Sequence, residues 1–174
     1  MSGIPAYRLP EGYEIRGMSP PDVSSWQSIW RENESLEKIP DTLFEKVYGT
    51  DWTVIQTRCL ILYDSTGSPV GTVSAWFDET QNGQSWGRIH WIALRPKSHG
   101  QGLGKVLLSQ GMERLKALGH QRCNLVTQFW RHTAIKLYLS FGFEPEITDE
   151  ETSARWKETW DAIGGNSIRD EARE

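Results

Sequence analysis

The amino-acid sequence predicts an α/β fold built around a central mixed β-sheet, and three observations predict it. Apolar runs at 58–64, 69–77 and 87–94 are separated by turn residues, which is typical of a meander of antiparallel strands. An amphipathic stripe of leucine and valine over 102–118 follows the third strand and predicts a long helix, which stops at a glycine. A strand-like run at 123–127 comes after that helix and completes a sheet with both parallel and antiparallel neighbours.

The remaining elements are indicated by local signals. Residues 12–17 form a short first strand, and the Ser-Pro-Pro-Asp run at 19–22 starts a helix with one apolar face. Pro-Asp at 40–41 opens a second helix. The stretch 78–85, with its Asn-Gly pair, turns the chain between two strands of the meander. Segment 152–163 fits either an amphipathic helix or a closing strand, so its state is left open.

Composition limits the class of protein. With 174 residues, 37% of them hydrophobic and 24% charged, the chain suits one domain over 1–163, followed by a polar, loose tail over 164–174. The net charge of −4, without a basic stripe, argues against a nucleic-acid partner. No leader opens the sequence, and no run approaches the roughly 20 apolar residues that cross a bilayer. A cytoplasmic protein without a membrane partner is therefore expected.

Cysteine and histidine offer no metal site. Cys59 and Cys123 lie inside apolar strand-like runs, so buried free thiols are expected. The four histidines show no metal-ligand spacing, and no metal is expected. His120 and His132 are expected at the surface, near helix ends.

The clearest functional signal is a glycine-punctuated turn between the strand that ends at 94 and the helix that follows. Gly100, Gly102 and Gly104 let the backbone bend tightly, so successive N–H groups can converge on a diphosphate at the positive end of the helix. The turn therefore predicts a phosphorylated cofactor.

Two common phosphate motifs do not fit this turn. A Walker loop is disfavoured because His99 and Val106 stand where that motif needs glycine and a hydroxyl residue. A dinucleotide fingerprint is disfavoured because Lys105 replaces its third glycine. ATP, GTP and NAD are thus poor candidates.

The turn instead resembles the cofactor-binding loop of the GNAT superfamily of N-acetyltransferases, Q/R-x-x-G-x-G/A, which holds the pyrophosphate of coenzyme A. Residues 99–104 read HGQGLG, so the glycines match and His99 replaces Gln or Arg. A second segment, RHTAIKLYLSFGFEP at 131–145, resembles the family's later motif, N-x-x-A-x-x-L-Y followed by Gly-Phe, with Arg131 in the place of Asn. The resemblance covers residues 55–145 and implies a GNAT-like mixed sheet of about six to seven strands flanked by about four helices.

The resemblance also implies acetyl-CoA as cosubstrate. In the family, the strand before the turn leaves its neighbour at a bulge and lends main-chain N–H groups to the thioester and the pantetheine arm, while the turn holds the pyrophosphate. The guanidinium at position 131 could approach a phosphate. The predicted cofactor-binding residues are Ile92, Ala93, Leu94, His99, Gly100, Gln101, Gly102, Leu103, Gly104, Lys105 and Arg131.

Two residues are candidates for proton transfer. The resemblance implies that Tyr138 acts as general acid to the CoA thiolate, although helical periodicity alone also fits a core aromatic residue. Arg88 stands where some family members use a Glu as general base. His90 lies on the same strand face and is the candidate general base, with a structural histidine, Asp78, Glu79 or a water chain as alternatives.

Together these features predict an acyltransferase that moves acetyl from acetyl-CoA directly to a primary amine of a small molecule or peptide. Acidic clusters at 32–45 and 144–151 weakly favour a cationic acceptor, although such clusters are usually solvated surface. A catalytically silent CoA-binding module, and a protein that binds another phosphate, are the alternatives. The nine tryptophans leave open an aromatic-lined acceptor pocket, a packed core or a homodimer contact.

Overall fold

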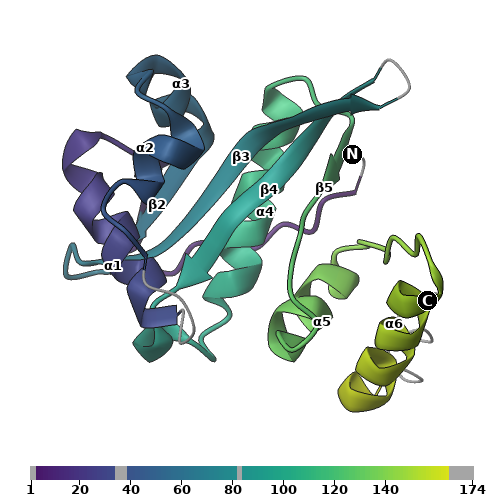
Figure 1. The fold of residues 1–174 in the computed structure, drawn as a ribbon. Helices are drawn as coiled ribbons and strands as arrows, with labels where there is room; N and C mark the ends of the chain where they lie inside the picture. The colour runs from purple at the N-terminus through teal and green to yellow at the C-terminus, as the bar shows by residue number, and fades with distance from the viewer. Residues whose placement is uncertain (1–2, 34–38, 82–83, 165–174) are drawn as a thin grey trace. The chain divides into compact units, whose positions relative to one another are not determined.

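The computed structural model describes residues 3–33, 39–81 and 84–164. The chain forms two compact units, unit 1 (Met1–Leu125) and unit 2 (Val126–Glu174) (Figure 1). The single domain expected over 1–163 stays a prediction. The Asn-Gly turn at 82–83 and residues 165–174 of the expected tail lie outside the described residues.

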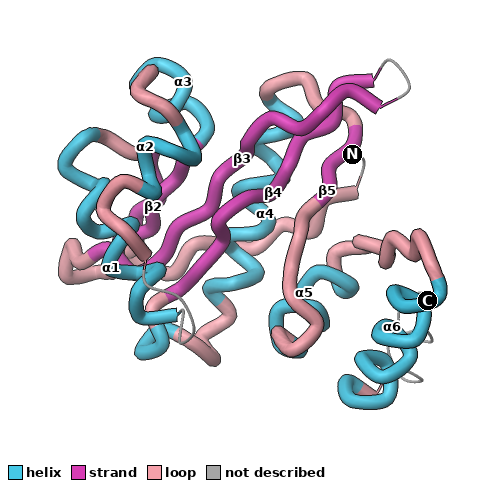
Figure 2. The backbone as a smooth tube through the Cα atoms, in the orientation of Figure 1, coloured by secondary structure: helices cyan, strands magenta, loops and turns pink. Residues whose placement is uncertain are grey.

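Unit 1 is built on one sheet of five strands in chain order, and Figure 2 shows β3, β4 and β5 side by side. Strands β1 to β4 pair antiparallel, and β4 pairs parallel with β5, so the sheet is mixed as predicted. The parallel pair needs a crossover, which the long helix between the two strands provides. The strands are β1 (Glu14–Gly17), β2 (Cys59–Tyr63), β3 (Pro69–Gln81), β4 (Gln84–Leu94) and β5 (Arg122–Asn124).

Six α-helices and two short 3₁₀ helices complete the described part of the chain. They are η1 (Pro20–Asp22), α1 (Val23–Asn33), α2 (Leu43–Tyr48), α3 (Trp52–Arg58), η2 (Pro96–Ser98), α4 (Leu103–Ala117), α5 (His132–Ser140) and α6 (Glu150–Ile163). The local sequence signals do not predict helix α3. It begins at Asp51, whose carboxylate accepts the N–H groups of Thr53 and Val54 and so caps its first turn.

The described residues form five strands, fewer than the six to seven expected. Segment 152–163, which the sequence left open, belongs to helix α6 and adds no closing strand. Asp149 caps this helix by accepting the N–H of Thr152 at 2.7 Å, and Gly164 ends it in the left-handed region at φ 74°. The α/β fold class is confirmed.

Helices cover both faces of the sheet of unit 1, with α1 and α2 on one face and α4 on the other. Ser74 of β3 bonds through its hydroxyl to the phenol of Tyr48 in α2 at 2.7 Å, so this residue faces α2. Its neighbour Val73 points to the opposite face, where α4 packs. A Cβ placed on Gly111 of α4 would lie 2.8 Å from Val73 and 3.0 Å from Ile89, so glycine lets the helix approach the sheet.

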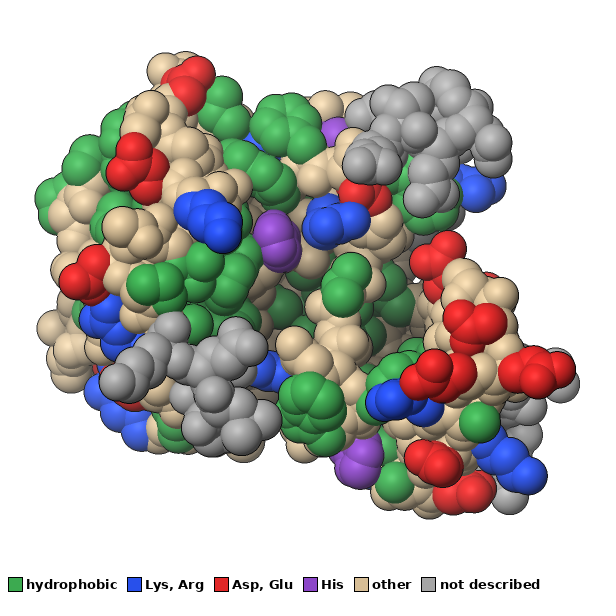
Figure 3. Space-filling view, in the orientation of Figure 1, with side chains coloured by type: hydrophobic (Ala, Val, Ile, Leu, Met, Phe, Trp, Pro, Cys, Tyr) green, Lys and Arg blue, Asp and Glu red, His purple; other side chains and the backbone are tan. Residues whose placement is uncertain are grey.

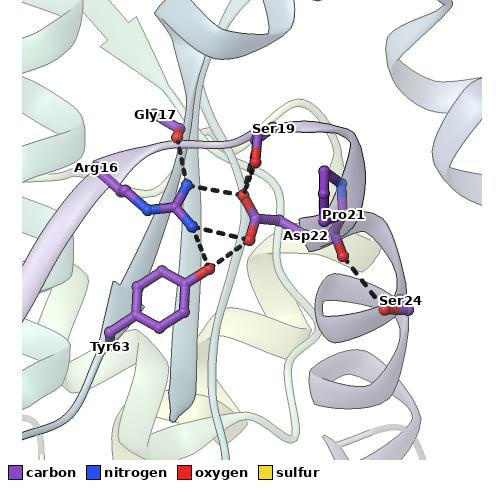
Figure 4. Close-up of polar contacts among 7 residues, drawn as sticks. All are labelled: Arg16, Gly17, Ser19, Pro21, Asp22, Ser24 and Tyr63. Atoms are coloured by element: carbon purple, nitrogen blue, oxygen red, sulfur yellow. Dashed lines mark hydrogen bonds and ion pairs between the residues drawn. The ribbon is translucent and has the colours of Figure 1, made fainter. Parts of the chain in front are cut away.

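A polar network fixes the start of α1 to the first two strands (Figure 4). Arg16 donates to the Asp22 carboxylate at 2.8 Å and to the Tyr63 phenol at 2.6 Å, and the Ser19 hydroxyl donates to Asp22 at 2.7 Å. Burial alone would raise the pKa of Asp22. The hydrogen bonds from Arg16, Tyr63 and Ser19 outweigh it and lower that pKa to about 2, so the carboxylate stays charged.

The structure shows how far Cys59, Cys123 and His120 are exposed, which can be compared with the exposures expected from the sequence. Cys59 is buried, Cys123 is half-buried, and both are free, as predicted for the thiols. The prediction for His120 is wrong: it is 6% exposed, because its ring packs under the sheet with Nε2 3.3 Å from a guanidinium nitrogen of Arg58. None of the helices in the described ranges is long and apolar enough to cross a membrane.

Candidate active site

The glycine turn opens helix α4 as predicted. Gly100 and Gly102 both have φ of 75°, in the left-handed region that side chains with a Cβ rarely adopt. A Cβ built on either glycine meets no heavy atom within 4 Å, so the space above both is open. Gly102 is the N-cap residue of α4, which runs for 15 residues from Leu103. The turn thus presents bare backbone at a helix N-terminus.

Some main-chain N–H groups of the turn already donate hydrogen bonds within the protein, and others are available to a ligand. The N–H of His99 donates to the carbonyl of Pro96 at 3.1 Å, and that of Lys105 donates to Gly102 at 3.0 Å. The first residues of α4, Leu103 and Gly104, have no carbonyl four residues earlier within the helix. Because the first turn of α4 also lacks an acidic side chain, the positive helix end fits a phosphate.

The polar side chains of the turn bond back to the protein. The His99 ring lies with Nε2 3.0 Å from the carbonyl of Leu94. Gln101 donates to the carbonyl of Lys97 at 3.2 Å, and the Lys105 ammonium lies 5.4 Å from the ring centre of Tyr7. The turn therefore offers main-chain amides and the exposed Lys105 ammonium to an anion.

Strand β4 carries the predicted bulge. His90 pairs with Ser74 and Ala93 with Thr72, so the two intervening residues of β4 oppose a single residue of β3. Trp91, the first residue of the bulge, has φ of 49°. A left-handed conformation costs a non-glycine residue about 1–2 kcal/mol, so packing and hydrogen bonds must hold it there.

The bulge decides which amides point away from the sheet. The N–H of Arg95 donates to Val70 at 2.8 Å, which fixes the hydrogen-bonding phase of this part of the ladder. By alternation, the amide of Ala93 faces β3 and those of Ile92 and Leu94 face the other edge. Strand β5 pairs with β4 only at residues 86–88, so in the described chain no strand covers that edge at 92–94.

The carbonyl of Leu94 confirms that direction. It accepts a hydrogen bond from Nδ2 of Asn33 at 2.8 Å and also lies next to the His99 ring. Because both partners are side chains, this carbonyl points away from β3 and toward the uncovered edge of β4. Three residues of β4 are predicted to bind the cofactor. The N–H groups of Ile92 and Leu94 point away from the sheet, and that of Ala93 faces β3.

His90 lies on the sheet face that carries α1 and α2. Its ring centre is 6.4 Å from that of Tyr48 and 5.7 Å from that of Trp91. Nδ1 is buried, and no described residue hydrogen-bonds it. Burial lowers the pKa of His90 to about 4, the charge of Arg88 adds to this, and Asp78 opposes it only in part. The imidazole is neutral at neutral pH.

The alternative base Asp78 is engaged elsewhere. Its side chain is only 5% exposed and forms an ion pair with Arg88 at 2.6 Å. Asn124 donates a further hydrogen bond to the same carboxylate, and its own carbonyl oxygen accepts from Arg88 at 3.3 Å. This network ties β3, β4 and β5 together. The side chain of Glu79, also named as an alternative, lies outside the described residues.

Tyr138 and Arg131 belong to unit 2. Tyr138 is 9% exposed and packs against Phe143, with ring centres 6.2 Å apart. Burial raises the pKa of Tyr138 to about 12, and the charge of Arg131 only partly opposes this. The phenol therefore keeps its proton at neutral pH. Arg131 is the N-cap residue of α5, and its carbonyl accepts the N–H of Ile135 at 2.9 Å.

Three members of the acidic clusters form ion pairs at the protein surface. Glu32 pairs with Arg95, Asp41 with Arg31, and Glu151 with Arg155. On the face of unit 1 seen in Figure 3, acidic and basic side chains are interspersed. Both observations weaken the inference of a cationic acceptor. Glu34 and Glu37 lie outside the described residues, and the described residues hold no cluster of ligands for a metal ion.

Comparison with known proteins agrees with this geometry. A model of the acetyltransferase (GNAT) family matches residues 23–143. The chain belongs to this family. The match includes the bulged strand, the glycine turn and the segment with Tyr138, so the resemblance stated from the sequence motifs is confirmed.

Similar proteins include acetyltransferases of several kinds. A mycothiol acetyltransferase of Geodermatophilus obscurus is 24% identical over an alignment of 160 residues, and the alignment covers 83% of this chain and 49% of that protein. The chain thus spans about half the length of this curated relative.

Solved structures show the fold. A phosphinothricin acetyltransferase of Sinorhizobium meliloti in complex with AcCoA has a TM-score of 0.63 at 21% identity, over 78% of this chain and 77% of that one. The NatC complex bound to Gag peptide and CoA has a TM-score of 0.66 at 16% identity, over 78% and 86%.

The structure adds site residues that the sequence motifs do not indicate. Asn33 reaches Leu94 from α1, and Thr72 donates its hydroxyl to the carbonyl of Trp91 at 3.1 Å. No sequence signal identifies either residue, because both contacts join segments that are far apart in the chain. The outlying φ of Trp91 likewise appears only in the folded backbone.

Proposed function

We propose that this chain is an N-acetyltransferase that moves acetyl from acetyl-CoA directly to a primary amine of a small molecule or peptide. The observation that supports it most is one continuous backbone path in unit 1, from the outward amides of Ile92 and Leu94 to the open glycine turn before α4. Such a path offers N–H donors both to a diphosphate and to an extended amide-bearing arm.

The residues present fit acetyl-CoA. Its pyrophosphate oxygens would accept hydrogen bonds from the main-chain N–H groups at the start of α4, where Gly100 and Gly102 leave room. Its arm and thioester carbonyl would take those of Ile92 and Leu94. When bound, acetyl-CoA supplies acetyl activated as a thioester. The phosphinothricin acetyltransferase and the NatC complex, solved with AcCoA and CoA, support this choice of cosubstrate.

Tyr138 is the proposed donor to the departing thiolate. A phenol with a pKa of about 12 is fully protonated near neutrality. Because an ordinary thiol has a pKa of about 8.5, the phenol stabilises the sulfur anion by donating a hydrogen bond more readily than by losing its proton.

His90 is the proposed proton acceptor for the attacking amine. Its imidazole is neutral over the physiological range, so a lone pair is available. Asp78 is the weaker candidate, since Arg88 and Asn124 already use its carboxylate. Because its pKa is about 4, His90 is a weak base. It would therefore pass the proton of the amine on to water and would not stay protonated.

The acceptor class includes small molecules and peptides. The mycothiol and phosphinothricin acetyltransferases are named for small molecules, and the NatC complex was solved with a peptide. A cytoplasmic location, the absence of nucleic-acid partners and a homodimer stay predictions of the sequence.

Two measurements test the proposal. Calorimetry with CoA, ATP and NAD should give heat with CoA at the lowest concentration, and a panel of amines with radiolabelled acetyl-CoA should yield at least one acetylated product. No heat from CoA at millimolar concentration would remove the cofactor assignment. Binding without transfer to any amine would identify a catalytically silent module instead.

A further inference from the structure

We propose that Thr72 and Trp91 are positioning residues that lock the bulge of β4 and thereby aim the amides of Ile92 and Leu94 at the open edge. The proposal rests on the proposed function, because these amides are the donors assigned to the pantetheine arm. It adds the groups that hold the donors in place.

The register shows why the bulge matters. Thr72 stands opposite Ala93, and the phase set by Arg95 and Val70 directs the main chain of Thr72 at β4. Without the extra residue, Ile92 would stand opposite Thr72 and donate its N–H to β3. A slip of one residue exchanges the inward and outward amides of a strand. The outward amides of residues 92 and 94 thus exist only while the bulge is kept.

Packing of the Trp91 side chain stabilises the bulge. Its indole packs between two tryptophans of α1, with ring centres 5.0 Å from Trp26 and 4.7 Å from Trp30, the latter edge-on at 85°. Both partners are buried. A residue at φ 49° persists only where its surroundings fix it, and this aromatic contact anchors the residue that carries the strain.

A hydrogen bond to the main chain of Trp91 also stabilises the bulge. The hydroxyl of Thr72 donates to the carbonyl of Trp91 at 3.1 Å, and Thr72 is 1% exposed. The part-buried carbonyl of Trp91 lies in the bulge, where the regular ladder is interrupted, and this hydroxyl satisfies it. The peptide between residues 91 and 92, whose nitrogen is the Ile92 donor, is therefore fixed at its oxygen.

The experiment compares three variants of the full chain. Thr72→Val removes the hydroxyl and keeps the shape, and Thr72→Ser keeps the hydroxyl. Ser109→Ala is the matched control, because Ser109 is 2% exposed and donates to the carbonyl of Pro5 at 2.7 Å, away from the bulge. Calorimetry is run with CoA and with ADP, which has a diphosphate but no pantetheine arm.

The expected result separates positioning from general stability. Thr72→Val should weaken CoA binding about five- to tenfold and leave ADP within about twofold, while Thr72→Ser and Ser109→Ala stay near wild type. Equal weakening of CoA and ADP, or a Thr72→Val variant that binds CoA like wild type, would overturn the proposal. If the wild-type chain binds no CoA, the proposed function fails first.

A second pair keeps the test open if Thr72→Val does not fold. Trp91→Phe shortens the anchor in the bulge, and Trp52→Phe changes a tryptophan stacked on Phe44, with ring centres 6.0 Å apart, outside the bulge. Amide hydrogen exchange should speed up at Ala93 and Arg95, whose N–H groups face β3 beside the bulge, in Trp91→Phe and stay unchanged there in Trp52→Phe. Equal protection in both variants would show that the indole does not hold the bulge.

Discussion

Asn33 donates from Nδ2 to the carbonyl oxygen of Leu94 at 2.8 Å and thereby joins the last residue of α1 to the last residue of β4. The same nitrogen donates to the carbonyl of Ile29 within α1 at 2.8 Å, so its position is fixed from both sides. Helix α1 thus contacts the strand at both ends of the segment 91–94, through its tryptophans and through this amide.

Replacing Asn33 with alanine should destabilise unit 1. The substitution removes two part-buried hydrogen bonds to main-chain carbonyls, and we expect a loss of about 1–2 kcal/mol in the free energy of unfolding measured in urea. His99→Ala, which removes the exposed partner of the same carbonyl, should cost less. A larger loss from His99→Ala than from Asn33→Ala would contradict this ranking.

A bulky residue in the glycine turn should abolish tight binding of CoA. Gly102→Val introduces a β-branched side chain at φ 75° in the space assigned to the pyrophosphate, and we expect at least about a tenfold rise in the Kd for CoA by calorimetry. Gly67→Val is the control, because Gly67 has φ 77° and open space in a turn between β2 and β3. Similar CoA affinities of the two variants would count against the site.

Removing the phenol of Tyr138 should lower turnover without affecting the cofactor. We expect Tyr138→Phe to reduce kcat about 10²-fold, within the usual range for a proton donor, and to leave CoA affinity within about twofold. Tyr63→Phe is the matched control: Tyr63 also has a pKa of about 12, raised first by burial and then by Asp22. Full turnover in Tyr138→Phe would exclude the phenol from the mechanism.

Acid should weaken the network at the start of α1. The pKa of Asp22 is about 2 in the folded chain, below its ordinary value of 3.8. Its contribution of about 2 kcal/mol is therefore present above pH 4 and lost as the pH falls from 4 to 2. Urea unfolding at several pH values should show a steeper acid loss for wild type than for Asp22→Asn. Parallel curves for the two proteins would refute the assignment.

His90 should stay neutral well below pH 6. Its pKa of about 4 lies below the ordinary 6.5, so the unfolded chain gains a proton first and stability falls as the pH drops from 6.5 to 4. NMR titration of the His90 ring should give a midpoint near 4, and His90→Gln should flatten this part of the stability curve. A midpoint near 6.5 would show that the ring is solvated.

Much of the fold could be predicted because its signals are local. The glycines of the turn, the apolar stripe of α4 and the runs of β2, β3 and β4 need only neighbouring residues to show their conformation. The helix state of α6 was left open because its short apolar pattern fits two periods. Asp149 and Gly164 cap it as a helix. Helix α3 was not predicted, because seven residues carry little periodicity.

The site is a different case, because contacts between distant segments complete it. The sequence predicts His120 at the surface near a helix end, but β4 and Arg58 cover it, so this prediction is wrong. The motifs gave the bulged strand in general terms. They could not indicate that Thr72 and the α1 tryptophans hold Trp91, since each of those contacts spans many residues.

The sequence by itself determined strands β2 to β4, helix α4 with the glycine turn at its start, and the family, because backbone preference and apolar spacing act over a few residues. Only the tertiary structure decided which amides of β4 point outward and how far burial lowers the pKa of His90. Register and desolvation depend on what packs against a residue, and here those neighbours come from α1, α2 and β3.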